Sequence, residues 1–169
     1  MPTSPPWFPI RTERLLLREF RESDLDDTHA YAIDPEVVRY MEWGPNTPAE
    51  TRAFLDRQLA DNAEWPRPGV TLAVEHVADA RMIGSTRLLV SDPANRTGDF
   101  GYSYHSAYWR QGYGTEVGRA ILDAAFRALG LHRMWAECDV QNVGSYGVMR
   151  KLGMRREAHT LASKLVKGA

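Results

Sequence analysis

The sequence predicts a single domain of the α/β class, with a mixed and mostly antiparallel sheet flanked by helices. Three observations support this prediction. Runs rich in β-branched and aromatic residues alternate irregularly with segments of helical periodicity. A length of 169 residues suits one hydrophobic core. Neither an internal repeat nor a low-complexity tract divides residues 1–169 into smaller units.

The first part of the chain predicts a strand followed by helices. A run of leucines between charged residues predicts the strand at 14–20. Ser23 or Asp24 is a suitable N-cap for a helix that extends to Ile33, where an Asp-Pro pair ends it. A short helix is expected at 36–41.

The four residues Thr47–Glu50 predict the start of another helix, because they combine an N-cap threonine, a proline in the first turn and a capping-box glutamate. This helix is expected to end near Asn62. Three strands follow, with a hairpin turn between the first two, at 70–77, 82–90 and 99–105.

The second half of the chain begins with a long amphipathic helix from about Gly112 to Leu129, whose apolar stripe would face the core. Gly130 is suited to end this helix. The remaining elements are expected to be a strand at 133–140, a helix at 143–152 and a last strand at 155–166.

Composition excludes several classes of function. The 21 basic and 22 acidic residues leave no net field that would attract nucleic acid or an anionic membrane. No apolar run is long enough to cross a bilayer or to act as a signal sequence. Cys138 is the one cysteine, so an internal disulfide is excluded and a reducing, cytoplasmic location is expected.

Residues 109–116, which immediately precede the long helix, read Trp-Arg-Gln-Gly-Tyr-Gly-Thr-Glu. Gly112 and Gly114 allow the backbone to curl, so that consecutive N–H groups and the positive end of the helix dipole converge on one anion. A pyrophosphate is the expected ligand, and an ordinary glycine-rich turn is the alternative. A dinucleotide fingerprint would need glycine in place of Val117, and a P-loop would continue Gly-Lys-Ser/Thr.

A second motif lies at 139–154, where a strand end leads into a short helix. It contains Asn-x-x-Ser at 142–145 and Lys-Leu-Gly-Met at 151–154. Together with the glycine loop, this order of motifs resembles the GNAT superfamily of acyl-CoA-dependent N-acetyltransferases, most closely its ribosomal-protein N-terminal (Rim-type) branch. Further likenesses to that branch lie at 12–18, 34–37, 101–102 and 108–109.

The resemblance implies a sheet that is splayed in the middle and acetyl-CoA as the cosubstrate, with no metal. In such enzymes the glycine loop binds the pyrophosphate of coenzyme A, and the pantetheine lies where the strand at 99–105 separates from the strand at 133–140. A backbone amide near Tyr104 would polarise the acetyl carbonyl. The implied cofactor-binding residues are Tyr104, Arg110, Gln111, Gly112, Tyr113, Gly114, Thr115, Asn142 and Lys151.

Catalysis in this family is a direct transfer from the thioester to a primary amine, which requires a base and allows an acid. Ser145 matches the proton donor of the branch, and Asn142 matches the residue that orients the serine or the cofactor. The alternative is that Asn142 only caps the helix and Ser145 only makes a hydrogen bond. Glu137 is the first candidate for the base, a solvated carboxylate is the alternative, and His105 and Tyr104 are reserves.

The sequence departs from the branch at several positions. Arg110 stands where glycine is usual, and Met149 stands where other branches carry a tyrosine acid. Rim-type chains continue past a Lys-Gly such as Lys167-Gly168 into another strand. A missing C-terminal strand is therefore expected. Either a second copy of the chain covers the exposed sheet edge, which would make a homodimer, or the sequence is truncated.

The expected acceptor is a protein N-terminus or a small amine, such as a polyamine or an aminoglycoside. The near-zero net charge does not distinguish between these acceptors. The alternative function is a non-catalytic acyl-CoA-binding or interaction module, which would retain the glycine loop and lack a working base.

Overall fold

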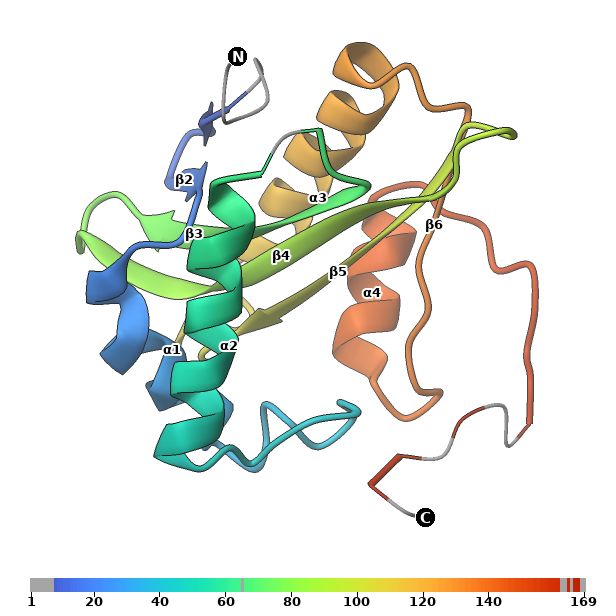
Figure 1. Ribbon diagram of the computed structural model, residues 1–169. Coiled ribbons are helices and arrows are strands. Elements are labelled where there is room, and N and C mark those ends of the chain that lie inside the picture. The colour runs from blue at the N-terminus through green and yellow to red at the C-terminus, as the bar shows by residue number, and fades with distance from the viewer. Residues whose placement is uncertain (1–7, 65, 162–163, 165, 168–169) are drawn as a thin grey trace.

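The computed structural model describes residues 8–64, 66–161, 164 and 166–167, and its centre is a six-stranded curled sheet (Figure 1). The spatial order of the strands follows the chain order. Every neighbouring pair is antiparallel except β5 and β6, which are parallel. This is the mixed, mostly antiparallel α/β sheet that the sequence predicts. The strands are β1 (Ile10–Arg11), β2 (Leu15–Arg18), β3 (Gly69–His76), β4 (Arg81–Asp92), β5 (Thr97–Tyr104) and β6 (Arg133–Trp135).

Helices cover both faces of the sheet (Figure 1). The helices α1 (Leu25–Ala32) and α2 (Pro48–Asn62) lie on one face, and α3 (Tyr113–Asp123) lies on the other, with α4 (Val143–Lys151) packed against α3. The chain continues from α3 into a π-helical turn at Ala124–Ala128. Short 3-10 turns lie at Glu22–Asp24 and Ser106–Tyr108.

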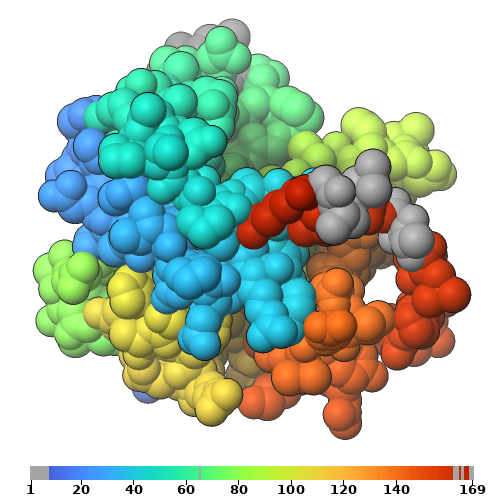
Figure 2. Space-filling view, turned by 90° about the horizontal axis from the view of Figure 1, so that it is seen from below, coloured from blue at the N-terminus to red at the C-terminus, as the bar shows by residue number. Residues whose placement is uncertain are grey.

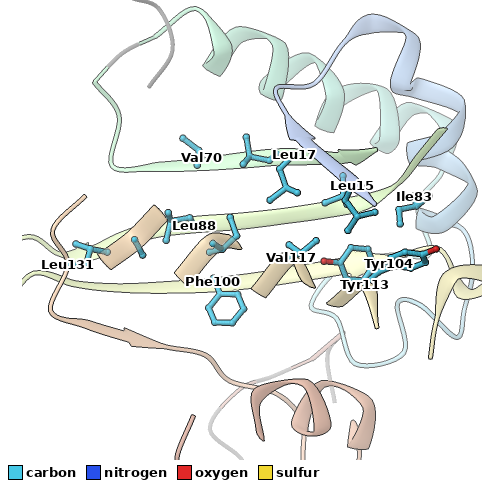
Figure 3. Packing of buried hydrophobic residues seen from close by; sticks show 14 residues of the cluster. Leu15, Leu17, Val70, Ile83, Leu88, Phe100, Tyr104, Tyr113, Val117 and Leu131 are labelled. Atoms are coloured by element: carbon cyan, nitrogen blue, oxygen red, sulfur yellow. The ribbon is translucent and has the colours of Figure 1, made fainter. Parts of the chain in front are cut away.

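Each face of the sheet has its own hydrophobic core, because side chains alternate along a strand. In β3, Leu72 and Val74 pack in the larger cluster, which includes Val117 of α3, while Ala73 belongs to the cluster under α1 and α2. Figure 3 shows the larger cluster between the sheet and α3. The glycine loop therefore begins a helix that is fixed by a buried apolar face.

The sheet separates between β5 and β6. The two strands pair only at three positions, from Thr97 opposite Arg133 to Asp99 opposite Trp135. Beyond these pairs, β5 continues to Tyr104 with β4 as its only ladder partner among the described residues. The sheet is therefore open along one edge of β5, close to the start of α3.

The predicted helix starts are confirmed where the sequence signals are local. The side chain of Thr47 accepts from Glu50 N (3.3 Å), and the Glu50 carboxylate accepts from Thr47 N (2.7 Å), which completes the capping box of α2. Gly112 is the N-cap of α3, and Gly130 has the left-handed φ of +64° that ends a helix.

Three predicted elements differ from the structure. Residues 36–41 form turns rather than a helix, because the Asp34 side chain accepts from Glu36 N (2.9 Å) and competes with helical bonding. The strand predicted at 133–140 ends at Trp135, where its partner strand diverges. Residues 155–161 form no strand, since none of the described residues pairs with them, and positions 162, 163 and 165 lie outside the described residues.

Red residues of the segment after α4, near the C-terminal end, lie against the turns before α2 (Figure 2). Lys164 Nζ donates to Glu42 Oε1 (2.7 Å) and also to Glu137, and Lys167 Nζ donates to Val38 O (2.7 Å). The segment therefore connects the stretch after β6 to the turns before α2. Within the described residues, none of the helices has the length and apolar character needed to cross a bilayer.

Candidate active site

The glycine loop presents a row of free backbone amides at the start of α3. Gly112 has a φ of +87°, and Glu116 N donates to Gly112 O (3.0 Å). Within the described part of the chain, no acceptor takes the N–H groups of residues 110–115. Arg110 adopts a φ of +60°, a left-handed conformation that glycine adopts without strain. Unpaired N–H groups beside the positive end of a helix dipole form an anion site.

The loop is anchored by Arg14, just before β2. Its Nε donates to Glu116 Oε2 (2.8 Å), its Nη1 donates to Gln111 O (3.0 Å), and its guanidinium lies 4.3 Å from the centre of the Tyr113 ring. Thr12 Oγ1 also donates to Glu116 (2.6 Å). Burial alone would raise the pKa of Glu116, but the hydrogen bonds from Thr12 and Arg14 outweigh it and lower that pKa. Charge-assisted bonds thus fix the loop to the sheet.

A second anchor connects the loop to the end of β3. His76 Nε2 lies 2.9 Å from the Tyr113 hydroxyl, and His76 Nδ1 lies 2.9 Å from Asp79 Oδ2. The Tyr108 hydroxyl donates to the same oxygen (2.8 Å) and is the main reason why the pKa of Asp79 is lowered. Tyr113 is therefore held from both sides, by Arg14 over its ring and by His76 at its hydroxyl.

The open edge of β5 carries a second free amide. His105 N donates to Ile83 O (2.8 Å) on the β4 side, so the N–H and C=O of Tyr104 point away from β4 into the opening. The indole Nε1 of Trp109 donates to that C=O (2.9 Å). No acceptor among the described residues takes the Tyr104 N–H, so this donor is available at the point where the strands separate.

The start of α4 lies against the same opening. Asn142 Oδ1 accepts from Ser145 N (3.1 Å), so Asn142 is the N-cap of α4, as the cap interpretation predicted. The Ser145 Oγ lies 3.3 Å from the Tyr102 hydroxyl of β5. Cys138 is half-buried beside them, and burial raises the pKa of its thiol against a lowering contribution from Ser145.

An open hollow of about 670 Å³ runs along α3 from the loop toward the end of α4. Gly112 and Thr115 line one part of the hollow, and Arg119 and Lys151 contribute positive charges. The hollow is also bordered by Thr12, Glu13, Arg14, Glu116, Ala120 and Asp123.

Glu137 lies apart from these groups. Its side chain is 55% exposed and is paired with Lys164. Met134 and Ala136 pack against the larger core, so alternation places the side chain of Glu137 on the opposite face. The structure thus brings the loop, the Tyr104 amide, Asn142 and Ser145 to one region, and it leaves Glu137 at the surface.

Several residues of this region were not found from the sequence. Tyr102 has no predicted catalytic or cofactor-binding role in the site, although period-two alternation places its side chain on the same face as Tyr104. Arg14 and His76 support the loop across long sequence distances, and no local pattern signals such contacts. The bond from Trp109 to Tyr104 spans only five positions and was also not predicted.

Comparisons with known proteins agree with this architecture. A family model described as "Acetyltransferase (GNAT) domain" matches residues 14–155. The uncharacterized N-acetyltransferase YnaD of Bacillus subtilis (strain 168) is 34% identical over 154 residues, which cover 88% of this chain and 83% of YnaD. The chain belongs to the GNAT acetyltransferase family and is an acyltransferase.

Solved structures share the fold. An acetyltransferase of the GNAT family from Bacillus anthracis has a TM-score of 0.83 at 28% identity, covering 95% of this chain and 92% of that chain. A spermidine N-acetyltransferase from Vibrio cholerae was solved in complex with CoA and spermine. It has a TM-score of 0.76 at 20% identity, covering 93% of this chain and 90% of that chain. This second likeness concerns the fold alone.

Proposed function

We propose that this chain transfers an acetyl group directly from acetyl-CoA to a primary amine. The observation that carries the proposal is the row of unpaired amides at residues 110–115, beside a hollow that also contains Lys151. A pyrophosphate fits these donors because it offers several anionic oxygens to converging N–H groups. CoA in the Vibrio cholerae structure supports the choice of ligand.

The loop amides of Arg110, Gln111, Gly112, Tyr113, Gly114 and Thr115 would then bind the pyrophosphate. Lys151, with Arg119 nearby, is suited to the 3′-phosphate at the far end of the hollow. The free N–H of Tyr104 is suited to the acetyl carbonyl, where a donor is worth a few kcal/mol as negative charge develops on the oxygen.

Ser145 is proposed to give its hydroxyl proton to the departing thiolate, and Asn142 to hold Ser145 at the start of α4. The cap bond from Asn142 supports this because it fixes the backbone of Ser145. Glu137 is the proposed base, acting through water. Its pairing with Lys164 requires that ammonium to move away first, because a base needs an available carboxylate.

The proposed acceptor is a protein N-terminus or a small amine. The motif likeness to the Rim-type branch supports the first, and the spermidine acceptor of the Vibrio cholerae protein supports the second. A thiol-release assay over N-terminal peptides, spermidine and an aminoglycoside distinguishes between them. Turnover is expected with at least one of these primary amines.

The binding step is tested by substituting Gly112→Ala. Alanine is strained by about 1–2 kcal/mol at a φ of +87°, so the loop should reshape and acetyl-CoA affinity should fall at least about tenfold in calorimetric titration. Gly130→Ala is the matched control, because it introduces comparable strain, at a φ of +64°, beyond the other end of α3. Its affinity should stay within about twofold of the wild type.

Two outcomes would contradict the proposal. Equal affinity of the Gly112→Ala variant and the wild type would exclude the loop as the binding site. Tight binding without thiol release on any amine of the panel would favour a non-catalytic acyl-CoA-binding module instead.

A further inference from the structure

The phenol of Tyr102 meets Ser145 across the opening of the sheet. The Tyr102 hydroxyl lies 3.3 Å from Ser145 Oγ, although the two residues are 43 positions apart and belong to β5 and α4. No backbone bond joins these two elements at this point among the described residues. The contact is therefore made by the side chains themselves.

The Tyr102 ring is held in a defined orientation. It stacks on Tyr104 with ring centres 5.4 Å apart and planes 24° apart. Both rings lie under the start of α3, because a methyl group added at Gly114 would be 3.6 Å from Tyr104 and 3.8 Å from Tyr102. The two rings are thus within van der Waals distance of the loop at position 114.

The phenol of Tyr102 is protonated at neutral pH, because its pKa is raised above the ordinary value of 10.0. Burial is the main reason that its pKa is raised, and the contact with Ser145 lowers the pKa by less. A serine hydroxyl has one proton to donate and two lone pairs that accept. A phenol that donates to Ser145 Oγ leaves the serine proton free to point elsewhere.

We propose that Tyr102 is a positioning residue, which donates its hydrogen bond to Ser145 Oγ and so directs the serine proton toward the sulfur of the departing thiol. This inference rests on the proposed function, in which Ser145 is the proton donor. Tyr102 itself does not contact the reacting atoms.

The step balances without another reactant. The amine nitrogen forms the new C–N bond, and the C–S bond breaks with its electron pair on sulfur. The Ser145 proton goes to sulfur, and the hydrogen bond from Tyr102 stabilises the oxygen that loses it. Glu137, the proposed base, takes the proton that the amine releases through water, and that proton then returns through water to Ser145.

The test compares Tyr102→Phe with the wild type in steady-state kinetics. Loss of the hydrogen bond should lower kcat about tenfold, equivalent to one hydrogen bond, and should change KM for acetyl-CoA by less than about twofold. In a Ser145→Ala background, the same substitution should have almost no further effect, because Tyr102 acts only through Ser145.

Tyr31→Phe is the matched control for lost packing and stability. Tyr31 makes the same kind of bond, 3.3 Å from its hydroxyl to Ser85 Oγ, in the separate cluster under α1 and α2. Its kcat should stay within about twofold of the wild type. Urea unfolding of each variant shows whether it is folded under assay conditions.

The outcomes separate the inference from the proposed function. If Ser145→Ala slows turnover and Tyr102→Phe slows it no more than Tyr31→Phe does, the role of Tyr102 is overturned and that of Ser145 stands. If the effects of Tyr102→Phe and Ser145→Ala multiply, Tyr102 does not act through Ser145. If Ser145→Ala leaves kcat unchanged, the proposed proton donor and the inference fail together.

Discussion

Single residues fix the loop by bonds that reach far along the chain. Arg14 and Glu116 are 102 positions apart, and together they bind the first turn of α3 to the strand pair at the sheet edge. Removing one partner would leave the other charge unpaired in a half-buried position. The resulting loss of folding free energy is larger than the net stabilisation that the ion pair contributes. Loop geometry is therefore set by this ion pair as well as by the glycines.

Glu116→Gln tests the role of this charge through acid unfolding. The folded pKa of Glu116 is lowered below its ordinary value of 4.5, so its contribution to stability is present above pH 4.5 and is lost as the pH falls through the folded pKa. The difference in unfolding free energy between wild type and variant should therefore be constant near neutral pH and shrink below pH 4.5. Urea titrations across this range measure it, and a difference that does not depend on pH would contradict the assignment.

At the scale of elements, the active site depends on how closely α3 and α4 approach. Gly118 of α3 allows this approach, because a methyl group placed there would be 2.5 Å from the nearest methyl carbon of Leu152. Gly114, one turn earlier, also faces α4, but less tightly: a methyl group placed there would be 3.3 Å from a methyl carbon of Val148. The two glycines let α4 carry Ser145 to the opening beside β5.

Gly118→Ala should destabilise the protein by about 1 kcal/mol, because overpacking outweighs the better helix propensity of alanine. Gly147→Ala in α4 is the matched control, since the added methyl group would meet no other part of the described structure within 4 Å beyond its chain neighbours and its own helix backbone. This control should be stabilised by about 0.5–1 kcal/mol. Thermal and urea unfolding of both variants measure the contrast, and equal shifts of the same sign would show that the helix contact is not tight.

At the scale of the whole molecule, buried phenols make the fold sensitive to alkaline pH. Burial raises the pKa of Tyr31 to about 12 and also raises the pKa of Tyr102 and of Tyr104. The unfolded chain ionises these groups near pH 10.0, so their contribution is intact below pH 10 and is lost as the pH rises toward 12. Stability should therefore decline across this window.

Tyr104→Phe isolates one of these groups. The Tyr104 hydroxyl is buried and has no hydrogen-bond partner among the described residues, so its removal should leave stability at pH 7 unchanged or increased. The variant should also lose less stability than the wild type between pH 10 and 12. Tyrosinate absorbance during alkaline titration follows the ionisation of the phenols, and circular dichroism follows unfolding at pH 7 and between pH 10 and 12. A variant that is clearly less stable at pH 7 would show that the hydroxyl has a partner.

Features that depend on residues close together in the chain could be predicted from the sequence, and features that depend on distant residues could not. The capping box at Thr47, the cap by Asn142 and the left-handed glycine at Gly112 depend on residues within one turn, and local patterns predict them. The strand expected at 133–140 stops at Trp135, because a strand continues only where a partner remains alongside it. A one-dimensional pattern contains no information about where β5 diverges.

The sequence by itself determined the α/β class, the order of most elements and the glycine loop at the head of an amphipathic helix, because each depends on residues close together in the chain. Only the tertiary structure decided that Arg14 and His76 hold the loop, that Tyr102 meets Ser145 and that Glu137 pairs with Lys164. Such contacts depend on how separate elements pack, and packing places residues side by side regardless of their separation along the chain.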